Sequence, residues 1–190
     1  EGEYEPRVTM MAYAESSDGL NWTRPTIGQV EFQGSTQNNI TFPQSGTIFK
    51  DESAAPHERY KLIYQDKTGG GDRVLCAFSP DGLAWTKFDS PILSNYVSDT
   101  QIVAKYDPEK GKYVGYFRGW DRHEHGRVHG RRAIAYSETD DFRRWPKPER
   151  IVMPDAQDGP ATDIYTNAYT PWPDGGDAHL MFPTFYQRGR

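Results

Sequence analysis

The sequence has little cysteine, no long apolar run and no excess of positive charge, and each shortage excludes a class of protein. The single cysteine, Cys76, excludes an internal disulfide and a metal site built from cysteines. No apolar run approaches the roughly 18 residues that a membrane-spanning helix needs. Twenty-seven acidic residues outnumber 22 Lys and Arg, which gives a net charge of −5. Bulk charge therefore does not favour nucleic-acid phosphates, and we expect neither nucleic acid nor membrane as a partner.

What remains is a globular composition that is rich in aromatic rings. The 190 residues are 35% hydrophobic and 26% charged, and their number suits one domain or part of a larger one. Aromatic residues make up 14% of the chain. Flat rings in a polar protein suit a β-sheet and also a surface that stacks on sugars. The sequence begins with Glu1 and shows no signal peptide, so we expect a piece of a longer protein.

An internal repeat is the strongest signal in the sequence. The segments Ala12–Trp22, Cys76–Trp85 and Ile134–Trp145 align, and their final tryptophans lie about 60 residues apart. Each copy predicts a strand, a tight turn and a Trp that opens the next strand, with Asp-Gly in the turn of the first two copies. The third copy has Asp141-Phe142 instead, so we expect its turn to differ. Because the tryptophan recurs in every copy, we assign it to the packing between sheets.

Further strands precede the second and third copies and complete the repeat. They are predicted at 47–51, 59–65, 103–107 and 112–118. Four short strands in a repeat of this length are typical of a β-propeller blade, and no helical periodicity of comparable length competes.

The sequence therefore predicts an all-β fold: an incomplete β-propeller of four-stranded antiparallel blades, with about three of five blades present. Residues 1–37 would end one blade, 38–96 and 97–160 would form two more, and 161–190 would begin another. A β-sandwich with coincidental hairpins is the alternative.

The repeat, Ala-x-Ser-x-Asp-Gly-x-x-Trp in its clearest form, resembles the five-bladed propeller glycosidases. These are relatives of glycoside hydrolase families 32, 43 and 68, and the closer resemblance is to a bacterial branch similar to the family 32 N-terminal domain. The pattern of that branch recurs at Asn38-Asn39-Ile40, Phe49-Lys50-Asp51, Glu58–Lys61, Ser98-Asp99-Thr100, Gly111–Tyr116 with Arg118, and Thr162–Tyr165. The family 32 motifs Asn-Asp-Pro-Asn, Arg-Asp-Pro and Glu-Cys are absent. The resemblance implies hydrolysis of glycosidic bonds in poly- or oligosaccharides.

Asp99 and Asp163 are the candidate catalytic residues. Glycosidic cleavage needs two carboxyl groups, about 5 Å apart for retention of configuration or about 6.5–9.5 Å apart for inversion. Each of the two aspartates stands just before a predicted inner strand, where polar residues converge on the mouth of a propeller channel. The alternative is that each caps a turn or a strand. Asn38 and Asn39 hold the matching place in the preceding blade and are candidates for binding sugar hydroxyls.

Four further residues are candidates for substrate binding. Arg118 has a planar fork that can hold a substrate carboxylate, or it can pair structurally with Asp99. Trp120, Tyr165 and Trp172 can stack on a sugar face, although ordinary packing between blades is the alternative. Asp51 and Asp107 end their predicted inner strands, and we expect them to cap turns.

The segment 120–132 is an insertion that we expect to project as a charged loop. It contains three histidines and several acidic residues, but their spacing matches no metal-binding motif. We therefore expect neither a metal nor another cofactor. Its basic run, Arg127–Arg132, is a candidate for attracting acidic sugars.

Three functions remain open. The first is a glycoside hydrolase with paired carboxylates at the channel mouth. The second is a carbohydrate-binding propeller without catalysis, which would keep the aromatic residues and lack the carboxylate pair. The third is a sialidase-like propeller, whose Ser-x-Asp-x-Gly-x-x-Trp turn differs here because Asp and Gly are adjacent. An extracellular or periplasmic location suits breakdown of polysaccharide better than a cytoplasmic one.

Overall fold

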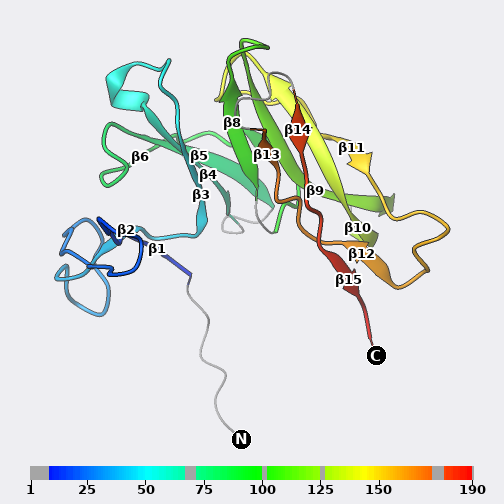
Figure 1. The fold of residues 1–190 in the computed structure, drawn as a ribbon, viewed down its shortest axis with the longest axis horizontal. Helices are drawn as coiled ribbons and strands as arrows, with labels where there is room; N and C mark the ends of the chain where they lie inside the picture. The colour runs from blue at the N-terminus through cyan, green and yellow to red at the C-terminus, as the bar shows by residue number, and fades with distance from the viewer. Residues whose placement is uncertain (1–8, 67–71, 100–101, 125–126, 173–177, 190) are drawn as a thin grey trace, which may run out of the picture.

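The computed structural model describes residues 9–66, 72–99, 102–124, 127–172 and 178–189, with only the backbone described over 122–124 and 127–129 (Figure 1). Within these residues every regular element is a β-strand, except for the 3₁₀ turn η1 (Pro56–Glu58). All strand pairs are antiparallel. The prediction of an all-β, antiparallel protein is therefore confirmed.

In chain order the strands are β1 (Met11–Ala12), β2 (Ile40–Phe42), β3 (Gly46–Lys50), β4 (Tyr60–Asp66), β5 (Arg73–Ser79), β6 (Thr86–Lys87), β7 (Leu93–Ser94), β8 (Val103–Asp107), β9 (Lys112–Glu124), β10 (Arg127–Thr139), β11 (Glu149–Val152), β12 (Thr162–Ile164), β13 (Thr170–Pro171), β14 (His179–Leu180) and β15 (Phe185–Gln187).

Two larger sheets form the centre of the molecule, each from strands that follow one another along the chain (Figure 1). The first sheet has the order β3-β4-β5-β6, and β7 also pairs with β5. The second has the order β8-β9-β10-β11. Smaller sheets flank them, in which β1 pairs with β2, β12 with β15, and β13 with β14. The chain thus forms successive antiparallel meanders at the predicted segments 38–96 and 97–160.

The strands of the first sheet are apolar on both faces because both faces are buried. Leu62 and Tyr64 of β4 pack into one hydrophobic cluster, whereas Ile63 between them packs into another. In β5, Val74 and Leu75 alternate in the same way. Successive side chains of a strand point to opposite faces, so one continuous apolar run supplies two clusters.

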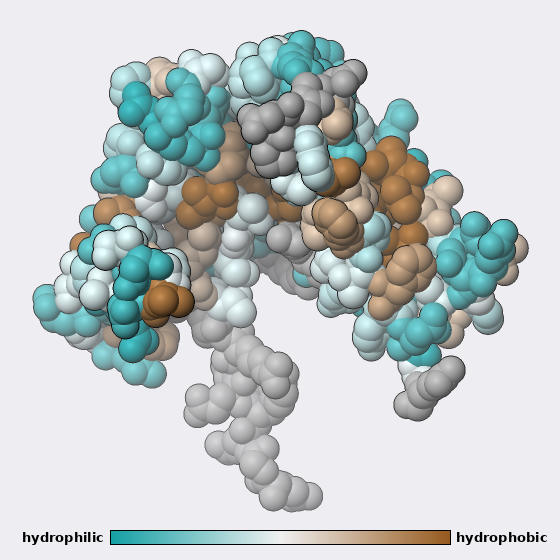
Figure 2. All heavy atoms as spheres, viewed as in Figure 1, coloured by the Kyte–Doolittle hydropathy of each residue, from teal (hydrophilic) through white to brown (hydrophobic). Residues whose placement is uncertain are grey.

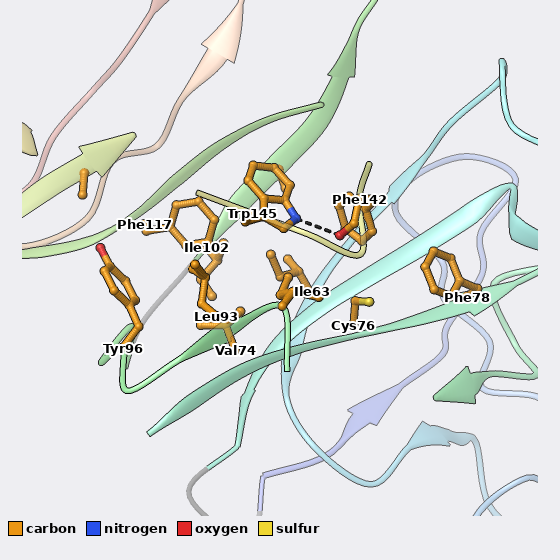
Figure 3. Close-up of a cluster of buried hydrophobic side chains, with 13 residues drawn as sticks. Ile63, Val74, Cys76, Phe78, Leu93, Tyr96, Ile102, Phe117, Phe142 and Trp145 are labelled. Atoms are coloured by element: carbon orange, nitrogen blue, oxygen red, sulfur yellow. Dashed lines mark hydrogen bonds between the residues drawn. The ribbon is translucent and has the colours of Figure 1, made fainter. Parts of the chain in front are cut away.

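The largest hydrophobic cluster lies between the two larger sheets (Figure 3). Ile63 and Cys76 of the first sheet meet Phe117 of β9 and Trp145, which follows β10. Cys76 is completely buried, and burial raises the pKa of its thiol to about 12. The opposite face of the second sheet packs against the segment that follows β11 through another hydrophobic cluster. In that cluster Val114 and Ile134 meet Ile164. The sheets therefore pack face to face in chain order.

The repeated turns are held by one pattern of hydrogen bonds. In the second copy, the Ser79 hydroxyl accepts bonds from the backbone N–H groups of Asp81 and Gly82. The Asp81 carboxylate accepts from the two N–H groups that follow Gly82, and the Trp85 indole donates to the Gly82 carbonyl at 3.1 Å. The first copy makes the same bonds between residues 16 and 22.

The third turn differs in backbone conformation, as predicted, but keeps part of the bonding. Gly82 has a φ of +79°, which favours glycine, whereas Phe142 at the matching position has no positive φ and buries its ring in the large cluster. The Asp141 carboxylate still accepts the N–H two residues on, and the Trp145 indole donates to the Phe142 carbonyl at 2.8 Å.

The three repeated tryptophans differ in burial. Trp145 is buried and Trp85 is partly buried against the cluster between β2 and the first sheet. Trp22 is 62% exposed, so its assignment to the packing between sheets is wrong. The turn bonds that place Trp22 are local, and in the described chain no sheet covers its ring.

The insertion at 120–132 is not the loop that the sequence predicts. Instead β9 continues to Glu124 and β10 begins at Arg127, so most of the segment is a long two-stranded ribbon. The pairing shifts register between His129 and Arg132, where Gly130 has a φ of +99°. Backbone pairing thus continues past the hydrophobic core, although the sequence there is charged.

Apolar side chains remain exposed at the C-terminal end of the described chain. Figure 2 shows brown surface on the side where β13, β14 and β15 run in Figure 1. Trp172, Phe182 and Phe185 are each more than half exposed. No helix in the described residues is long and apolar enough to cross a membrane.

Candidate functional site

Asp99 lies on an open cleft at the edge between the two larger sheets. The cleft has a volume of about 590 Å³, and the Asp99 side chain is 28% exposed. Hydroxyl and amide side chains share the lining with the carboxylate. They are Thr9, Ser45, Thr47, Tyr64, Gln65 and Ser98. A carboxylate surrounded by neutral donors and acceptors suits a ligand that carries many hydroxyl groups.

Arg118 of β9 is the charged partner of Asp99. Its Nε lies 3.5 Å from Oδ1 of Asp99, and its side chain is completely buried. The segment before Asp99 also holds the Arg118 backbone. The Ser98 hydroxyl accepts from the Arg118 N–H at 3.1 Å, and the Tyr96 hydroxyl donates to the Arg118 carbonyl at 2.7 Å. Burial lowers the pKa of the Arg118 guanidinium, and the neighbouring Asp99 carboxylate opposes that change.

Trp120 and Tyr165 contact the guanidinium groups of two arginines. The Arg118 Cζ lies 4.6 Å from the Tyr165 ring centre and 5.8 Å from that of Trp120. The Arg132 Cζ lies 5.2 Å from both rings. These are cation–π distances. The alternative of internal packing therefore accounts for these contacts of both rings better than stacking on a sugar.

Asp163, the second candidate catalytic residue, has its carboxylate engaged by arginines of the chain. It is completely buried in β12. Its Oδ1 accepts from the Arg132 backbone N–H and from Arg188 Nη2, both at 2.8 Å. Its Oδ2 accepts from Arg132 Nη1 at 2.7 Å. Both oxygens are thus occupied by donors of the chain, which leaves neither to exchange a proton with a substrate. The prediction that it is catalytic finds no geometric support.

Asn38 and Asn39 use their side chains to hold the backbone before β2. The Asn38 amide donates to the carbonyls of Val30 and Ser35, and its Oδ1 accepts from the Ile40 N–H. The Asn39 amide donates to the Tyr13 carbonyl at 2.6 Å. Within the described chain, neither shares a contact or the cleft with Asp99. The structure therefore does not bring Asn38 and Asn39 together with Asp99, as the prediction of one substrate site requires.

Arginines of the 120–132 insertion serve the fold. The Arg131 guanidinium bonds to the Asp121 carboxylate and to backbone carbonyls between residues 154 and 159. The Arg132 guanidinium forms an ion pair with Asp163. Arg131 and Arg132 are therefore engaged within the fold and do not fit the prediction that the run 127–132 attracts acidic sugars. The side chains of the histidines at 123, 125 and 129 are not among those that the structure describes. Among the described residues, no group of His, Cys, Asp and Glu is placed to hold a metal ion.

Asp51 and Asp107 cap turns, as predicted. Asp107 accepts from backbone N–H groups of the loop that follows β8. Asp51 accepts from the N–H and hydroxyl of Ser53, and it also pairs with the buried Lys61 at 3.0 Å and with the Tyr113 hydroxyl at 2.8 Å. Burial alone would raise the pKa of Asp51, but the bonds from Ser53, Lys61 and Tyr113 hold it below its usual range.

The sequence argument missed the residues that complete the cleft. Ser45 adjoins β3 and Thr47 lies within it, whereas Ser98 and Asp99 lie several residues before β8. The place that matches Asp99 in the preceding repeat is held by Asn38 and Asn39, so the repeat gave no signal for Ser45 or Thr47. Gln65 carries no signal either, because it only alternates with buried residues near the end of β4.

The chain matches no model of a known protein family, and a search of curated proteins finds no match either.

Proposed function

We propose that this chain folds as blades of a β-propeller that acts on carbohydrate, similar to glycoside hydrolase families 32 and 43. The successive four-stranded meanders, packed face to face through hydrophobic clusters, support the propeller. The neighbouring inner strands β3 and β8 are in contact, as adjacent blades would require. The repeated Ser/Thr-x-Asp turns support one structural unit used several times.

The observation that carries the proposal is the setting of Asp99. Of the two predicted catalytic aspartates, Asp99 is accessible, and it lines a cleft with hydroxyl and amide side chains. The guanidinium of the buried Arg118 lies 3.5 Å from the Asp99 carboxylate. A fixed carboxylate on such a cleft is what a sugar ring meets in a glycosidase subsite.

The chemistry that this setting suits is base or nucleophilic catalysis of glycosidic bond hydrolysis. A carboxylate that a cleft leaves accessible can activate a water or attack the anomeric carbon. A second carboxyl group must protonate the leaving oxygen, and Asp163 is not placed to do so.

A carbohydrate-binding propeller without catalysis is the second candidate. One observation favours it: Asp99 is the one carboxylate among the described residues that line its cleft. In that case the same groups would bind sugar hydroxyls, and the glycosidic bond would stay intact.

The test is release of reducing sugar from a panel of oligosaccharides by the full chain and by its Asp99→Asn variant. Loss of a catalytic carboxylate is expected to lower the rate by about 100-fold or more. Asp89→Asn is the matched control, because Asp89 is exposed and carries the same charge. Circular dichroism and the urea midpoint report whether Asp99→Asn is still folded.

Four outcomes separate the candidates. Release that collapses only in folded Asp99→Asn supports hydrolysis at Asp99. Release that is equal in all three proteins refutes the role of Asp99. Binding without release, weakened by Asp99→Asn, supports the non-catalytic candidate. No binding and no release on a broad panel would refute a role in carbohydrate chemistry.

A further inference from the structure

A second cleft adjoins the Asp99 cleft and shares a wall with it. It has a volume of about 500 Å³. Tyr96 and Val97 line this second cleft, whereas Ser98 and Asp99, the next residues along the chain, line the first. One short segment therefore separates the two clefts. A ligand that contacts both clefts must therefore cross this segment.

The second cleft is positively charged in a chain that is negatively charged overall. Arg118, Lys147 and Arg150 line it, and Glu149 is the one acidic residue among its lining residues. The whole chain carries −5. A local excess of positive charge on such a background is a feature of the cleft and not of the composition, and it raises the local concentration of anions.

Two donors on residues that line this cleft have no partner within the described chain. The exposed Lys147 ammonium makes no ion pair or hydrogen bond there. The Trp120 indole Nε1 is buried and has no hydrogen-bond acceptor in the same residues. Buried donors in proteins are rarely left unsatisfied, so an acceptor from a ligand or solvent is expected beside this one. Arg150 is fixed at the rim, where its Nη1 donates to the carbonyls of Trp120 and Asp121.

The remaining wall of the second cleft is apolar. Val97 and Pro148 line it, and Met153, which is 46% exposed, contributes a flexible apolar side chain. A combination of cations and apolar surface suits a ligand that has an anionic group on a ring with a C–H face.

We propose that the second cleft binds the carboxylate or sulfate group of an acidic sugar, so that the ligand of this protein is an anionic oligosaccharide. The anion would lie against Lys147 and Arg150, and a neighbouring sugar unit would reach Asp99. This assignment rests on the proposed function. It also places recognition of acidic sugars on the segment 147–150 rather than on Arg131 and Arg132, which are occupied within the fold.

Calorimetric titration of the full chain with matched saccharides tests the proposal. The probes are a galacturonic acid trimer, its neutral methyl ester and a sulfated galactose trimer. We expect at least about tenfold tighter binding of an acidic probe than of the neutral ester, and a loss of that difference at high salt. The two acidic probes distinguish carboxylate from sulfate recognition. Equal binding of the acidic and neutral probes would overturn the proposal and leave the proposed function intact.

Lys147→Gln locates the anion. Because Lys147 is exposed, its loss should weaken the acidic probe by about threefold to tenfold and leave the neutral ester unchanged. Lys50→Gln removes the same charge from a surface pair with Glu52 and serves as the control. If both variants weakened binding of the acidic probe equally, the effect would come from overall charge, and the second cleft would not be the anion site.

A separate measurement tests the anion site without a sugar. In an NMR titration with sodium sulfate against sodium chloride at equal ionic strength, the Trp120 indole N–H signal should shift with sulfate in the wild type and less in Lys147→Gln. A sulfate response without any sugar binding would refute the proposed function and not the anion site. No response to sulfate, together with no preference for acidic sugars, would refute the anion site.

Discussion

Replacing Asp163 by Asn tests whether this aspartate is structural. The substitution keeps the shape of the side chain and removes its charge. In the native protein the carboxylate accepts three hydrogen bonds of 2.7–2.8 Å, from the N–H and guanidinium of Arg132 and from the guanidinium of Arg188. The variant would keep one acceptor oxygen and would turn an NH₂ group toward the guanidinium of either Arg132 or Arg188.

The expected loss of stability follows from the burial of the group. Breaking a fully buried ion pair costs about 3–5 kcal/mol. The side chains of Arg132 and Arg188 are 24% and 41% exposed, so both can recover some hydration once Asp163 is neutral. We therefore expect a loss of about 2–3 kcal/mol. In urea this corresponds to a midpoint lowered by about 1 M.

Tryptophan fluorescence during urea unfolding measures this loss, because Trp145 is buried in the largest cluster. Asp89→Asn is again the control, with an expected change within about 0.5 kcal/mol. Sugar release or binding is measured on the same samples under conditions where both proteins are folded. If Asp163→Asn kept the wild-type midpoint and abolished sugar release, Asp163 would be catalytic and the reasoning from its arginine partners would be wrong.

Three further changes probe the fold. Gly115→Ala should cost about 1–3 kcal/mol, since a Cβ there would lie 2.6 Å from Phe117 and 2.7 Å from Trp145; an unchanged urea midpoint would contradict this packing. Cys76, buried and with its pKa raised to about 12, should resist a thiol reagent at pH 8 until urea unfolds the chain, and fast labelling of the native protein would argue against that burial. The pKa of Asp51 is lowered by folding, so its stabilisation is present above about pH 4 and is lost as the pH falls through the folded value. The stability difference between wild type and Asp51→Asn should therefore shrink on acidification, and a constant difference from pH 7 to pH 3 would refute the assignment.

The sequence predicts the parts of the fold that depend on neighbouring residues. The Ser79 and Asp81 turn closes within seven residues, so its recurrence was visible as a pattern. The partners of Asp163 lie 31 and 25 residues away, on β10 and beyond β15, and no local pattern announces them. The long β9–β10 ribbon was missed for a related reason: its pairing is set by the core strands from which it extends, and its own charged sequence indicates a loop.

The sequence predicts equivalent places for Asp99 and Asp163, but Asp163 lies within β12 whereas Asp99 precedes β8, and the two differ in their surroundings. Arg118 reaches Asp99 with one contact of 3.5 Å and leaves its carboxylate open to a cleft. Arg132 and Arg188 enclose Asp163 and leave it no exposed surface. The surroundings of each carboxylate thus depend on its arginine partners more than on its place in the repeat. It follows that the function of such a fold must be argued from the residues that do not repeat. In this chain they include the segment from Lys147 to Arg150, and replacing the exposed Lys147 should change ligand choice at the proposed anion site while the sheets remain intact.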